Sequence, residues 1–328
     1  MENPLFTIVM PCLNEEANIS RAVKSLVDDY VLRNGEILIV DGGSTDRTRE
    51  IVSDLAGKYP IRLLENPNRL QSHGMNIGIR EARGAIIIRA DAHGLYPPDY
   101  VRRCVRMLEP EDIANAGGVM VPAGETPVQK AIARAMRHPL GVGDAKYHLG
   151  RYRGYYEGVY LGSFKKNIFD KVGLYDPKAH PKEDAEMNLR IIRAGGKIWL
   201  DGSLEVIYRP RKSYAGLFRQ YFHYGRGRCY TTLKHRRFTS WRQVLPPVWV
   251  MALFGSAVLS FWTPLFLIFP GLYATAVLFA ALFGKIDPRP SLKERFLIFP
   301  AFVSMHIAWG SGFLSKLPGG LAAGDREK

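Results

Sequence analysis

Residues 5–16 read LFTIVMPCLNEE, and residues 36–46 read EILIVDGGSTD. Each stretch begins with a short run of aliphatic and β-branched residues, which is typical of a buried strand, and ends in a polar loop. The pattern continues along the first third of the chain, with strands expected at 5–10, 36–40, 61–65 and 85–89 and helices expected up to 26, up to 58 and at 71–82. Ser44 or Thr45 can cap the second of these helices. This alternation predicts an α/β fold with a mostly parallel sheet and helices on both faces.

The composition excludes several classes of protein. The chain has 328 residues, of which 47% are hydrophobic and 23% charged, so disordered and fibrous proteins are excluded. An excess of 45 Lys and Arg over 31 Asp and Glu gives a net charge of +14, which calls for an anionic partner such as a nucleotide, a nucleic acid or a membrane surface. The three cysteines lie far apart, which indicates a reducing compartment and argues against disulfide scaffolds and zinc ribbons. The first residues carry no secretory signal, so we expect the chain to begin in the cytosol.

The last quarter of the chain is strongly apolar. Residues 246–284 contain no charged residue, and because roughly 20 apolar residues span a bilayer, this run suits two crossings. Thr263-Pro264 or Pro270-Gly271 would make the turn, and residues 296–315 form a third apolar stretch. We therefore expect a membrane region at 246–328 with two to three transmembrane helices, whose basic linker lies on the cytosolic side. Buried core helices are the alternative.

A basic segment precedes the apolar region. Residues 209–237 contain nine Lys and Arg, no Asp or Glu, and six interleaved aromatic residues. Such a composition next to apolar helices predicts an amphipathic interfacial segment, residues 209–245, on an anionic leaflet. Most of the net charge is thereby assigned to a membrane, and no nucleic acid is expected as a partner.

Polar residues follow the expected strands at their carboxyl ends, where open α/β sheets bind ligands. They are Asn14, Glu15, Asp41, Asp46, Asp91 and His93. A dinucleotide-binding domain would carry G-x-G-x-x-G after its first strand, whereas this loop carries two glutamates, so a dehydrogenase is disfavoured. A nucleotide can still bind among carboxylates if its base and ribose are hydrogen-bonded and a divalent cation screens its phosphates.

The order of four motifs is specific. TIVMPCLNEE, IVDGGSTD, Asp91-Ala92-His93 and Lys182-Glu183-Asp184, followed by a basic helix with Gln and Arg, resemble the inverting family 2 glycosyltransferases of GT-A fold. Within that family the sequence is similar to bacterial exopolysaccharide glucosyltransferases of the succinoglycan type. The resemblance covers roughly residues 5–237 and implies a Rossmann-like GT-A glycosyltransferase domain at 1–208.

The resemblance implies a UDP-sugar donor. Pro11, Asn14 and Glu15 would line the base and ribose, and Asp41 would accept hydrogen bonds from the uracil, with Asp46 nearby. Two structural alternatives stay open, since D-G-G-S is a common turn composition and Asp46 can cap the following helix.

Asp91 and His93 predict a metal site. Side chains two apart at a strand end share a face and can meet one cation. The family has a second carboxylate where His93 stands, and an imidazole ligand shifts the preference from Mg²⁺ toward Mn²⁺. Asp91 is thus assigned to the metal or the diphosphate, while His93 is either a ligand or a surface histidine.

By resemblance, Asp184 deprotonates the acceptor hydroxyl. Neighbouring carboxylates would raise one pKa to a useful value, whereas the alternative is that acidic residues in a first helical turn answer the helix dipole. Tyr155, Tyr156, Glu157 and the strand 158–163, which contains Gly162, are expected to line the acceptor groove, because aromatic side chains stack on sugars; an ordinary central strand is the alternative. Glu183 is also expected to bind the acceptor.

The segment RQYFHYGR, residues 219–226, occupies the place of the Q-x-x-R-W motif of processive relatives. Gln220 matches, His223 and Tyr224 depart from the motif, and Arg226 would supply the missing cation to the diphosphate. We therefore expect the transfer of a single sugar.

The sequence as a whole predicts a hexosyltransferase on the cytosolic side of the inner membrane. It would transfer one hexose, expected to be glucose, from a UDP-sugar to a polyprenyl-diphosphate-linked oligosaccharide in exopolysaccharide biosynthesis. Other polysaccharide-assembly proteins are further expected partners. Two alternatives are transfer to polyprenyl phosphate itself and an inactive scaffold of a polysaccharide assembly complex.

Overall fold

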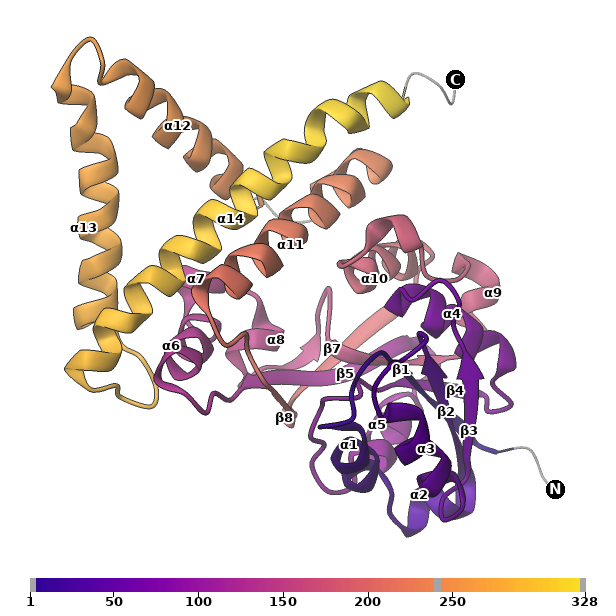
Figure 1. Cartoon of the computed structure of the whole chain (residues 1–328). Coiled ribbons are helices and arrows are strands. Elements are labelled where there is room, and N and C mark those ends of the chain that lie inside the picture. Colours follow the sequence, from indigo (N-terminus) through magenta and orange to yellow (C-terminus); the bar gives the residue numbers. More distant parts are fainter. Residues whose placement is uncertain (1–3, 239–242, 325–328) are drawn as a thin grey trace. The chain divides into compact units, whose positions relative to one another are not determined.

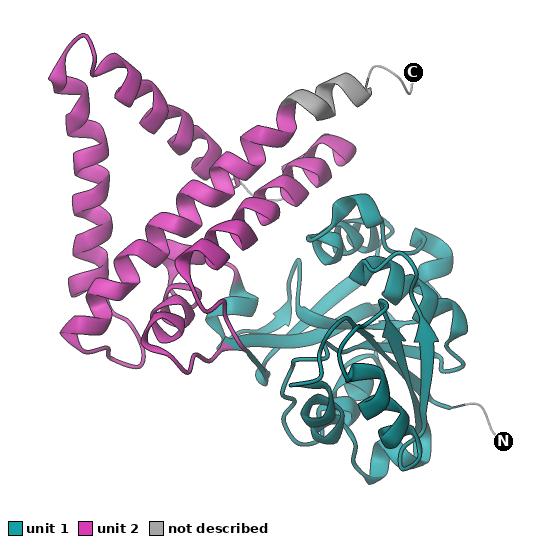
Figure 2. Cartoon of the chain, in the orientation of Figure 1, with its two compact units in different colours: residues 1–121, 146–208 teal, residues 122–145, 209–328 magenta. Residues whose placement is uncertain are grey.

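A computed structural model describes residues 4–238 and 243–324, with side chains described as far as residue 317. The chain divides into two compact units (Figure 2). Unit 1 comprises Met1–Val121 and Lys146–Tyr208, and unit 2 comprises Pro122–Ala145 and Arg209–Lys328. The division after Tyr208 coincides with the expected domain boundary, while residues 122–145, which the sequence analysis placed in the first domain, group with unit 2.

Unit 1 alternates strands and helices (Figure 1). Its first part comprises β1 (Phe6–Cys12), α1 (Ile19–Leu26), α2 (Asp29–Asn34), β2 (Gly35–Asp41), α3 (Thr48–Ala56), β3 (Ile61–Glu65), α4 (Gln71–Glu81), β4 (Ile86–Arg89), α5 (Tyr100–Met107) and β5 (Ile113–Pro122). Its second part comprises α8 (Lys146–Leu149), β6 (Arg153–Tyr155), β7 (Tyr160–Lys165), α9 (Ile168–Val172), η1 (Pro177–Ala179), α10 (Glu183–Arg193) and β8 (Lys197–Tyr208).

The sheet is mixed. Its eight strands lie in the order β3-β2-β1-β4-β7-β5-β8-β6. The parallel pairing predicted from the sequence holds for β3, β2, β1 and β4. Beyond β4 the sheet turns antiparallel, since β7 runs opposite to both β4 and β5, and β6 runs opposite to β8. The carboxyl ends of β1, β2 and β4 therefore meet at one edge, and the loops that follow them lie together there.

The core lies on both faces of the sheet, as the continuous apolar runs predict. In β1, Ile8 and Met10 pack with α1 and α5, whereas Val9 faces α4 on the other side. Helix α4 approaches β1 closely, because a Cβ on Gly78 would lie 2.3 Å from a methyl group of Val9. This close packing fixes the start of α4 beside the edge at which the loops gather.

Unit 2 is helical. It comprises α6 (Pro127–Ala135), α7 (Pro139–Val142), α11 (Tyr214–His235), α12 (Leu245–Leu259), η3 (Pro264–Leu267), α13 (Ile268–Phe283) and α14 (Leu292–Gly324). Of the expected interfacial segment 209–245, residues 214–235 form α11, which packs along α14, and residues 239–242 lie outside the described residues. Two glycines allow the backbones of α11 and α14 to approach closely. A Cβ on Gly225 would lie 2.0 Å from the carbonyl oxygen of Trp309, and a Cβ on Gly312 would lie 2.0 Å from the carbonyl oxygen of Phe222.

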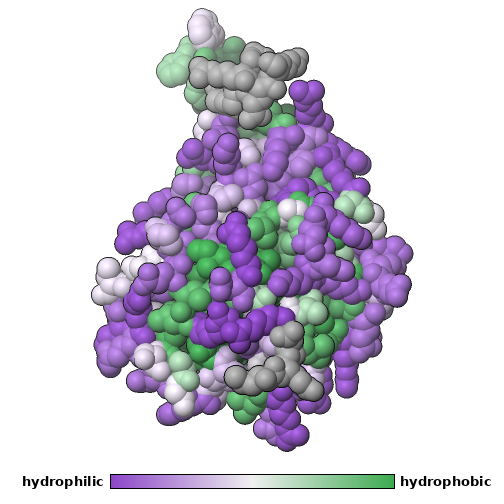
Figure 3. Space-filling view, turned by 90° about the vertical axis from the view of Figure 1, so that its right-hand side faces the viewer, coloured by the Kyte–Doolittle hydropathy of each residue, from purple (hydrophilic) through white to green (hydrophobic). Residues whose placement is uncertain are grey.

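Two helical stretches among the described residues are long and apolar enough to cross a membrane, Pro264–Phe283 and Leu292–Leu317. Helix α12 is apolar but has only 15 residues. The chain turns just before Pro264, and Pro270-Gly271 lies inside α13, so the first of the two expected turns is the one that forms. Phe261 and Trp262 at this turn are 89% and 77% exposed. On the face drawn in Figure 3, hydrophobic side chains form patches that are separated by hydrophilic ones.

Candidate active site

The loops after β1 and β2 are joined by hydrogen bonds. The backbone N–H of Asn14 donates to Ser44 Oγ at 2.9 Å, and the N–H of Thr45 donates to Asn14 Oδ1 at 2.8 Å. The N–H of Glu15 donates to Thr48 Oγ1 at 2.7 Å. Reciprocal bonds of this kind hold the two loops as one wall of the site.

Glu15 also connects this wall to the loop after β4. Its Oε1 lies 2.9 Å from His93 Nδ1, and its Oε2 accepts from Asn18 Nδ2 at 2.8 Å. The ring of His93 meets that of Tyr208 edge to face, with 6.3 Å between centroids. Two residues predicted separately, Glu15 for the nucleotide and His93 for the metal, are thus in direct contact.

Asp41 is fully buried beneath the loop that follows it. Its carboxylate accepts hydrogen bonds from the N–H groups of Gly43 and Ser44, each at 3.1 Å, and from the Ser44 hydroxyl. Arg49 Nη1 lies 3.3 Å from Asp41 Oδ2. The turn role left open by the sequence is therefore present, and a hydrogen bond from uracil would have to replace one of these donors. The nucleotide role of Asp41 stays a prediction.

The other predicted nucleotide residues of unit 1 lie nearby. Asp46 Oδ1 accepts from both the N–H and the hydroxyl of Thr48, at 3.0 and 2.6 Å, although the N-cap of α3 is Arg47 and not Asp46. Pro11 is buried in β1, where it faces Gly74 of α4. The roles of Asp46 and Pro11 toward a nucleotide also stay predictions.

Arg89 unites Asp91 and Asp184. It is the last residue of β4, its side chain is 6% exposed, and its Nη2 lies 3.4 Å from Asp91 Oδ1. Its Nη1 forms an ion pair with Asp184 Oδ1 at the start of α10. Two aspartates 93 positions apart in the sequence therefore contact the same side chain in unit 1.

Three contacts fix the position of Asp91. Gln71 Nε2, at the first residue of α4, donates to Asp91 Oδ1 at 2.9 Å. The hydroxyl of Tyr96 accepts from the backbone N–H of Asp91 at 2.6 Å and donates to its carbonyl oxygen at 2.9 Å. All of the side-chain bonds that the structure gives Asp91 go to Oδ1, so Oδ2 has no donor among the described residues.

Burial and the neighbouring charges together set the pKa values of Arg89 and Asp184. Burial alone would lower the pKa of Arg89, but the carboxylates of Asp184 and Asp91 raise it well above its ordinary value, so the guanidinium stays charged. Burial raises the pKa of Asp184, and the nearby charges of Glu183 and Asp91 add to this rise while Arg89 opposes it. Asp184 therefore binds a proton more readily than an isolated aspartate.

Glu183 and Asp184 differ in what they face. The side chain of Asp184 is 43% exposed, while that of Glu183 is 3% exposed and lies 3.7 Å from His180 Nδ1. Burial would raise the pKa of Glu183, but the hydrogen bond from His180 and the charge of Arg89 lower it below its ordinary value. Asp184 is thus the carboxylate of this pair that solvent can reach.

The residues expected to bind the acceptor, Glu157 and Gly162, and those expected to bind the diphosphate of the donor, Gln220 and Arg226, lie in different environments. Gly162 is buried in β7, where a Cβ would lie 2.6 Å from Asn115 Oδ1, and Glu157 is half-buried between β6 and β7. Gln220 and Arg226 belong to α11 of unit 2, where Gln220 Nε2 donates to the Tyr224 hydroxyl at 2.8 Å. The binding roles of these residues stay predictions.

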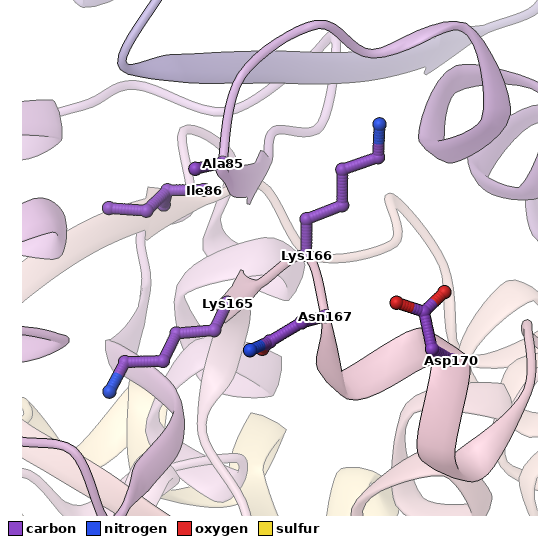
Figure 4. Close-up of a pocket in the computed structure, with 6 residues that line it drawn as sticks. All are labelled: Ala85, Ile86, Lys165, Lys166, Asn167 and Asp170. Atoms are coloured by element: carbon purple, nitrogen blue, oxygen red, sulfur yellow. The ribbon is translucent and has the colours of Figure 1, made fainter.

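A surface hollow of about 670 Å³ lies where β4 begins, at the end of this strand opposite to Asp91 (Figure 4). Ala85, Ile86, Lys165 and Lys166 line it together with Asn167 and Asp170. Ile86 begins β4, whereas Asp91 follows the end of that strand, so the hollow is separate from the carboxylate cluster.

The sequence analysis missed Arg89 and Gln71. Arg89 ends the run AIIIR, and the available signal was a charged residue closing an apolar strand two positions before Asp91. A buried arginine requires acidic partners, and that requirement points to Asp91 and to a second carboxylate elsewhere in the chain. No local signal marks Gln71.

Comparison with known proteins identifies the family of the chain. The family model described as glycosyl transferase family 2 matches residues 7–173. The chain is 36% identical over 316 residues to the succinoglycan biosynthesis protein ExoA of Rhizobium meliloti (strain 1021), with 94% of each chain covered. The chain belongs to glycosyltransferase family 2.

Two other similarities are to a more distant relative and to a solved structure. A dolichyl N-acetyl-alpha-D-glucosaminyl phosphate 3-beta-D-2,3-diacetamido-2,3-dideoxy-beta-D-glucuronosyltransferase of Methanococcus voltae is 27% identical over 230 residues, which cover 67% of this chain and 71% of that protein. The mannosyltransferase PcManGT of Pyrobaculum calidifontis, solved with GDP-Man and Mn²⁺, has a TM-score of 0.61 at 18% identity, over 97% of this chain and 88% of its own. This likeness confirms the predicted GT-A fold of the glycosyltransferase.

Proposed function

We propose that this glycosyltransferase is a membrane-associated hexosyltransferase of exopolysaccharide biosynthesis. It transfers one hexose, glucose, from a UDP-sugar to a hydroxyl group of a polyprenyl-diphosphate-linked oligosaccharide, with inversion at the anomeric carbon. The observation that carries the proposal is the ion-pair cluster in which Arg89 contacts both Asp91, at the end of the parallel strands, and Asp184, which solvent reaches. In the proposed site, Asp91 would face the donor and Asp184 would act as the base, and Arg89 contacts both.

In the proposed reaction, Asp184 accepts the proton of the acceptor hydroxyl while the acceptor oxygen bonds to the anomeric carbon. The bond from that carbon to the β-phosphate oxygen breaks, and UDP leaves with the bonding electrons. The raised pKa of Asp184 makes it a better proton acceptor, and the permanently charged Arg89 keeps its carboxylate oriented. Single displacement of this kind inverts the anomeric configuration.

The residues present fit a divalent cation with few protein ligands. Among the described residues no group of three His, Cys, Asp or Glu side chains could hold a metal, yet Asp91 Oδ2 has no donor there and His93 lies two residues on. Cations that bind nucleotide phosphates commonly take one or two protein ligands and complete their shell from the phosphates and water. Mn²⁺ or Mg²⁺ held by Asp91 and His93 would offset the charge that develops on the leaving diphosphate.

The proposed acceptor and location rest on the relatives and on unit 2. The succinoglycan protein is named for exopolysaccharide synthesis, and the Methanococcus relative is named for transfer to a dolichyl-linked sugar. The apolar stretches 264–283 and 292–317 would anchor the enzyme in the inner membrane, with its catalytic unit on the cytosolic side. A lipid-linked sugar would present its hydroxyl groups at the membrane surface. Other polysaccharide-assembly proteins would act on the product.

An Asp184→Asn variant tests this proposal. Purified enzyme is given radiolabelled UDP-glucose and a lipid-linked oligosaccharide acceptor, and product is counted in an organic extract. Because general base catalysis contributes about 10²–10⁴-fold, we expect transfer to fall by that factor while donor binding by calorimetry is retained. The matched control is Asp170→Asn, an exposed carboxylate beside the separate hollow, which should leave transfer unchanged. Near-normal transfer by Asp184→Asn would refute the assigned base.

Transfer to polyprenyl phosphate itself is the second candidate, favoured by the 30% identity over 106 residues to an undecaprenyl-phosphate 4-deoxy-4-formamido-L-arabinose transferase of Aeromonas hydrophila. Supplying undecaprenyl phosphate in place of the oligosaccharide separates the two, because only this candidate then yields an organic-soluble labelled product. UDP-galactose and UDP-N-acetylglucosamine in the same assay test the assignment of glucose.

A further inference from the structure

Helix α6 of unit 2 carries a row of three cations. Lys130, Arg134 and Arg137 follow one another at spacings of four and three, which places them on one side of α6 and of the turn after it. They line a hollow of about 220 Å³, whose other wall contains Asp287 and Pro288 of the connection between α13 and α14. The hollow lies wholly within unit 2, apart from the aspartate cluster of unit 1.

The acidic groups nearby do not neutralise this hollow. Arg134 Nη1 pairs with Glu294 at 3.0 Å, but its Nε is buried without a hydrogen-bond partner in the described structure. Lys130 and Arg137 make no ion pair with a described residue, and Asp287 is the acidic side chain in the lining. Together, residues 127–137 and 284–295 carry seven basic and two acidic side chains. So many like charges at one place are stabilised by an anion.

The position of the hollow indicates which anion. Its second wall joins Phe283, the end of one apolar stretch, to Leu292, the start of the other, and both side chains are exposed. Arg295 holds this connection in place by donating to the carbonyl oxygens of Ala281 and Gly284, at 3.0 and 3.2 Å. If the two apolar stretches lie in a bilayer, the hollow is at the depth of the lipid phosphates.

We propose that this hollow binds the phosphate of an anionic glycerophospholipid. The Arg134 and Arg137 guanidinium groups offer the planar donor pairs that match phosphate oxygens, and the Lys130 ammonium adds a third donor. Basic pockets beside membrane helices recognise lipid headgroups in this way. The bound lipid would fix α6 and the connection between α13 and α14 at the membrane surface, and this inference does not depend on the sugar substrates.

The test measures lipid binding by the full-length protein in detergent. Fluorescent phosphatidylglycerol and fluorescent phosphatidylcholine are titrated against the wild type and against a Lys130→Gln/Arg137→Gln variant. Each basic residue near an anionic surface contributes roughly fivefold in affinity, so we expect the double variant to bind phosphatidylglycerol about 30-fold more weakly. Phosphatidylcholine should bind weakly to both proteins.

Charge-matched controls separate a site from general attraction. Arg33→Gln/Lys58→Gln removes two exposed cations of unit 1 and should leave the affinity unchanged, while Lys130→Arg/Arg137→Lys should preserve it. Melting curves confirm that each variant is folded. Equal affinity for the two lipids, no loss in the double Gln variant, or an equal loss in the unit 1 control would overturn the proposal. Binding of inorganic phosphate as tight as that of phosphatidylglycerol would also overturn it, by assigning the site to a free anion.

Discussion

An Arg89→Met variant removes the cation between Asp91 and Asp184 while keeping much of the side-chain volume. The Arg89 side chain is 6% exposed, and loss of one partner of a buried ion pair costs about 3–5 kcal/mol. Asp184 is 43% exposed, so water screens its charge, and we expect a loss of about 3 kcal/mol. For a domain of roughly 150–250 residues, this lowers the unfolding midpoint of unit 1 by about 6–12 °C.

The same variant changes the pH dependence of transfer. Burial, Glu183 and Asp91 raise the pKa of Asp184, and Arg89 is the group that opposes this rise. Without Arg89 the pKa of Asp184 rises further. Because the base acts as a carboxylate, activity is lost as pH falls through this pKa, and the acid limb of kcat/KM should move to higher pH.

Two further variants show whether the shift comes from this cluster. Arg62→Met breaks ion pairs with Glu36 and Glu81, so it should cost stability and leave the acid limb in place. Adding Asp184→Asn to Arg89→Met removes the unpaired charge and should restore part of the lost stability. A folded Arg89→Met enzyme with an unmoved acid limb would refute the electrostatic account of the base.

Three other predictions concern unit 2 and the metal. Gly225→Ala should lower the melting temperature of the detergent-solubilised enzyme by overpacking worth about 1–3 kcal/mol, whereas Gly255→Ala, with nothing within 4 Å of its Cβ, should not. Tyr273→Phe removes the 2.9 Å hydrogen bond to His306 and should cost about 1 kcal/mol in the same measurement, an unchanged midpoint being the contrary result. EDTA should stop transfer, and Mn²⁺ should restore it at least as well as Mg²⁺. The His93→Ala variant should reduce the advantage of Mn²⁺ over Mg²⁺. Full turnover in EDTA would exclude the metal.

The parallel half of the fold could be predicted because its signals are local. β3 covers the expected residues 61–65, and β1, β2 and β4 differ from expectation by one or two residues at their ends. Each of these strands is a short apolar run followed by turn residues, so a window of ten residues contains the information.

The antiparallel half could not be predicted in the same way. β5 contains Gly117 and Gly118, which weaken a local strand signal, yet a Cβ on Gly118 would lie 1.9 Å from the carbonyl oxygen of Leu204 in β8. Gly118 is therefore required by a strand that lies far away in the sequence. The same holds for Arg89, because the ion pair that assigns it to the site is with Asp184, 95 residues later in the sequence. Asp91 and Asp184 could be found from their motifs, but the arginine between them needed the tertiary structure.

The backbone contact between α11 and α14 has a consequence for experiments in lipid. With no side-chain layer between Gly225 and Trp309 or between Gly312 and Phe222, the two helices tilt as one body. If the apolar stretch 292–317 spans a bilayer as proposed, a thinner or thicker bilayer would change the tilt of α14, and Gln220 and Arg226 on α11 would turn with it. Reconstitution into lipids of graded acyl length would then reorient these two side chains without altering the sequence.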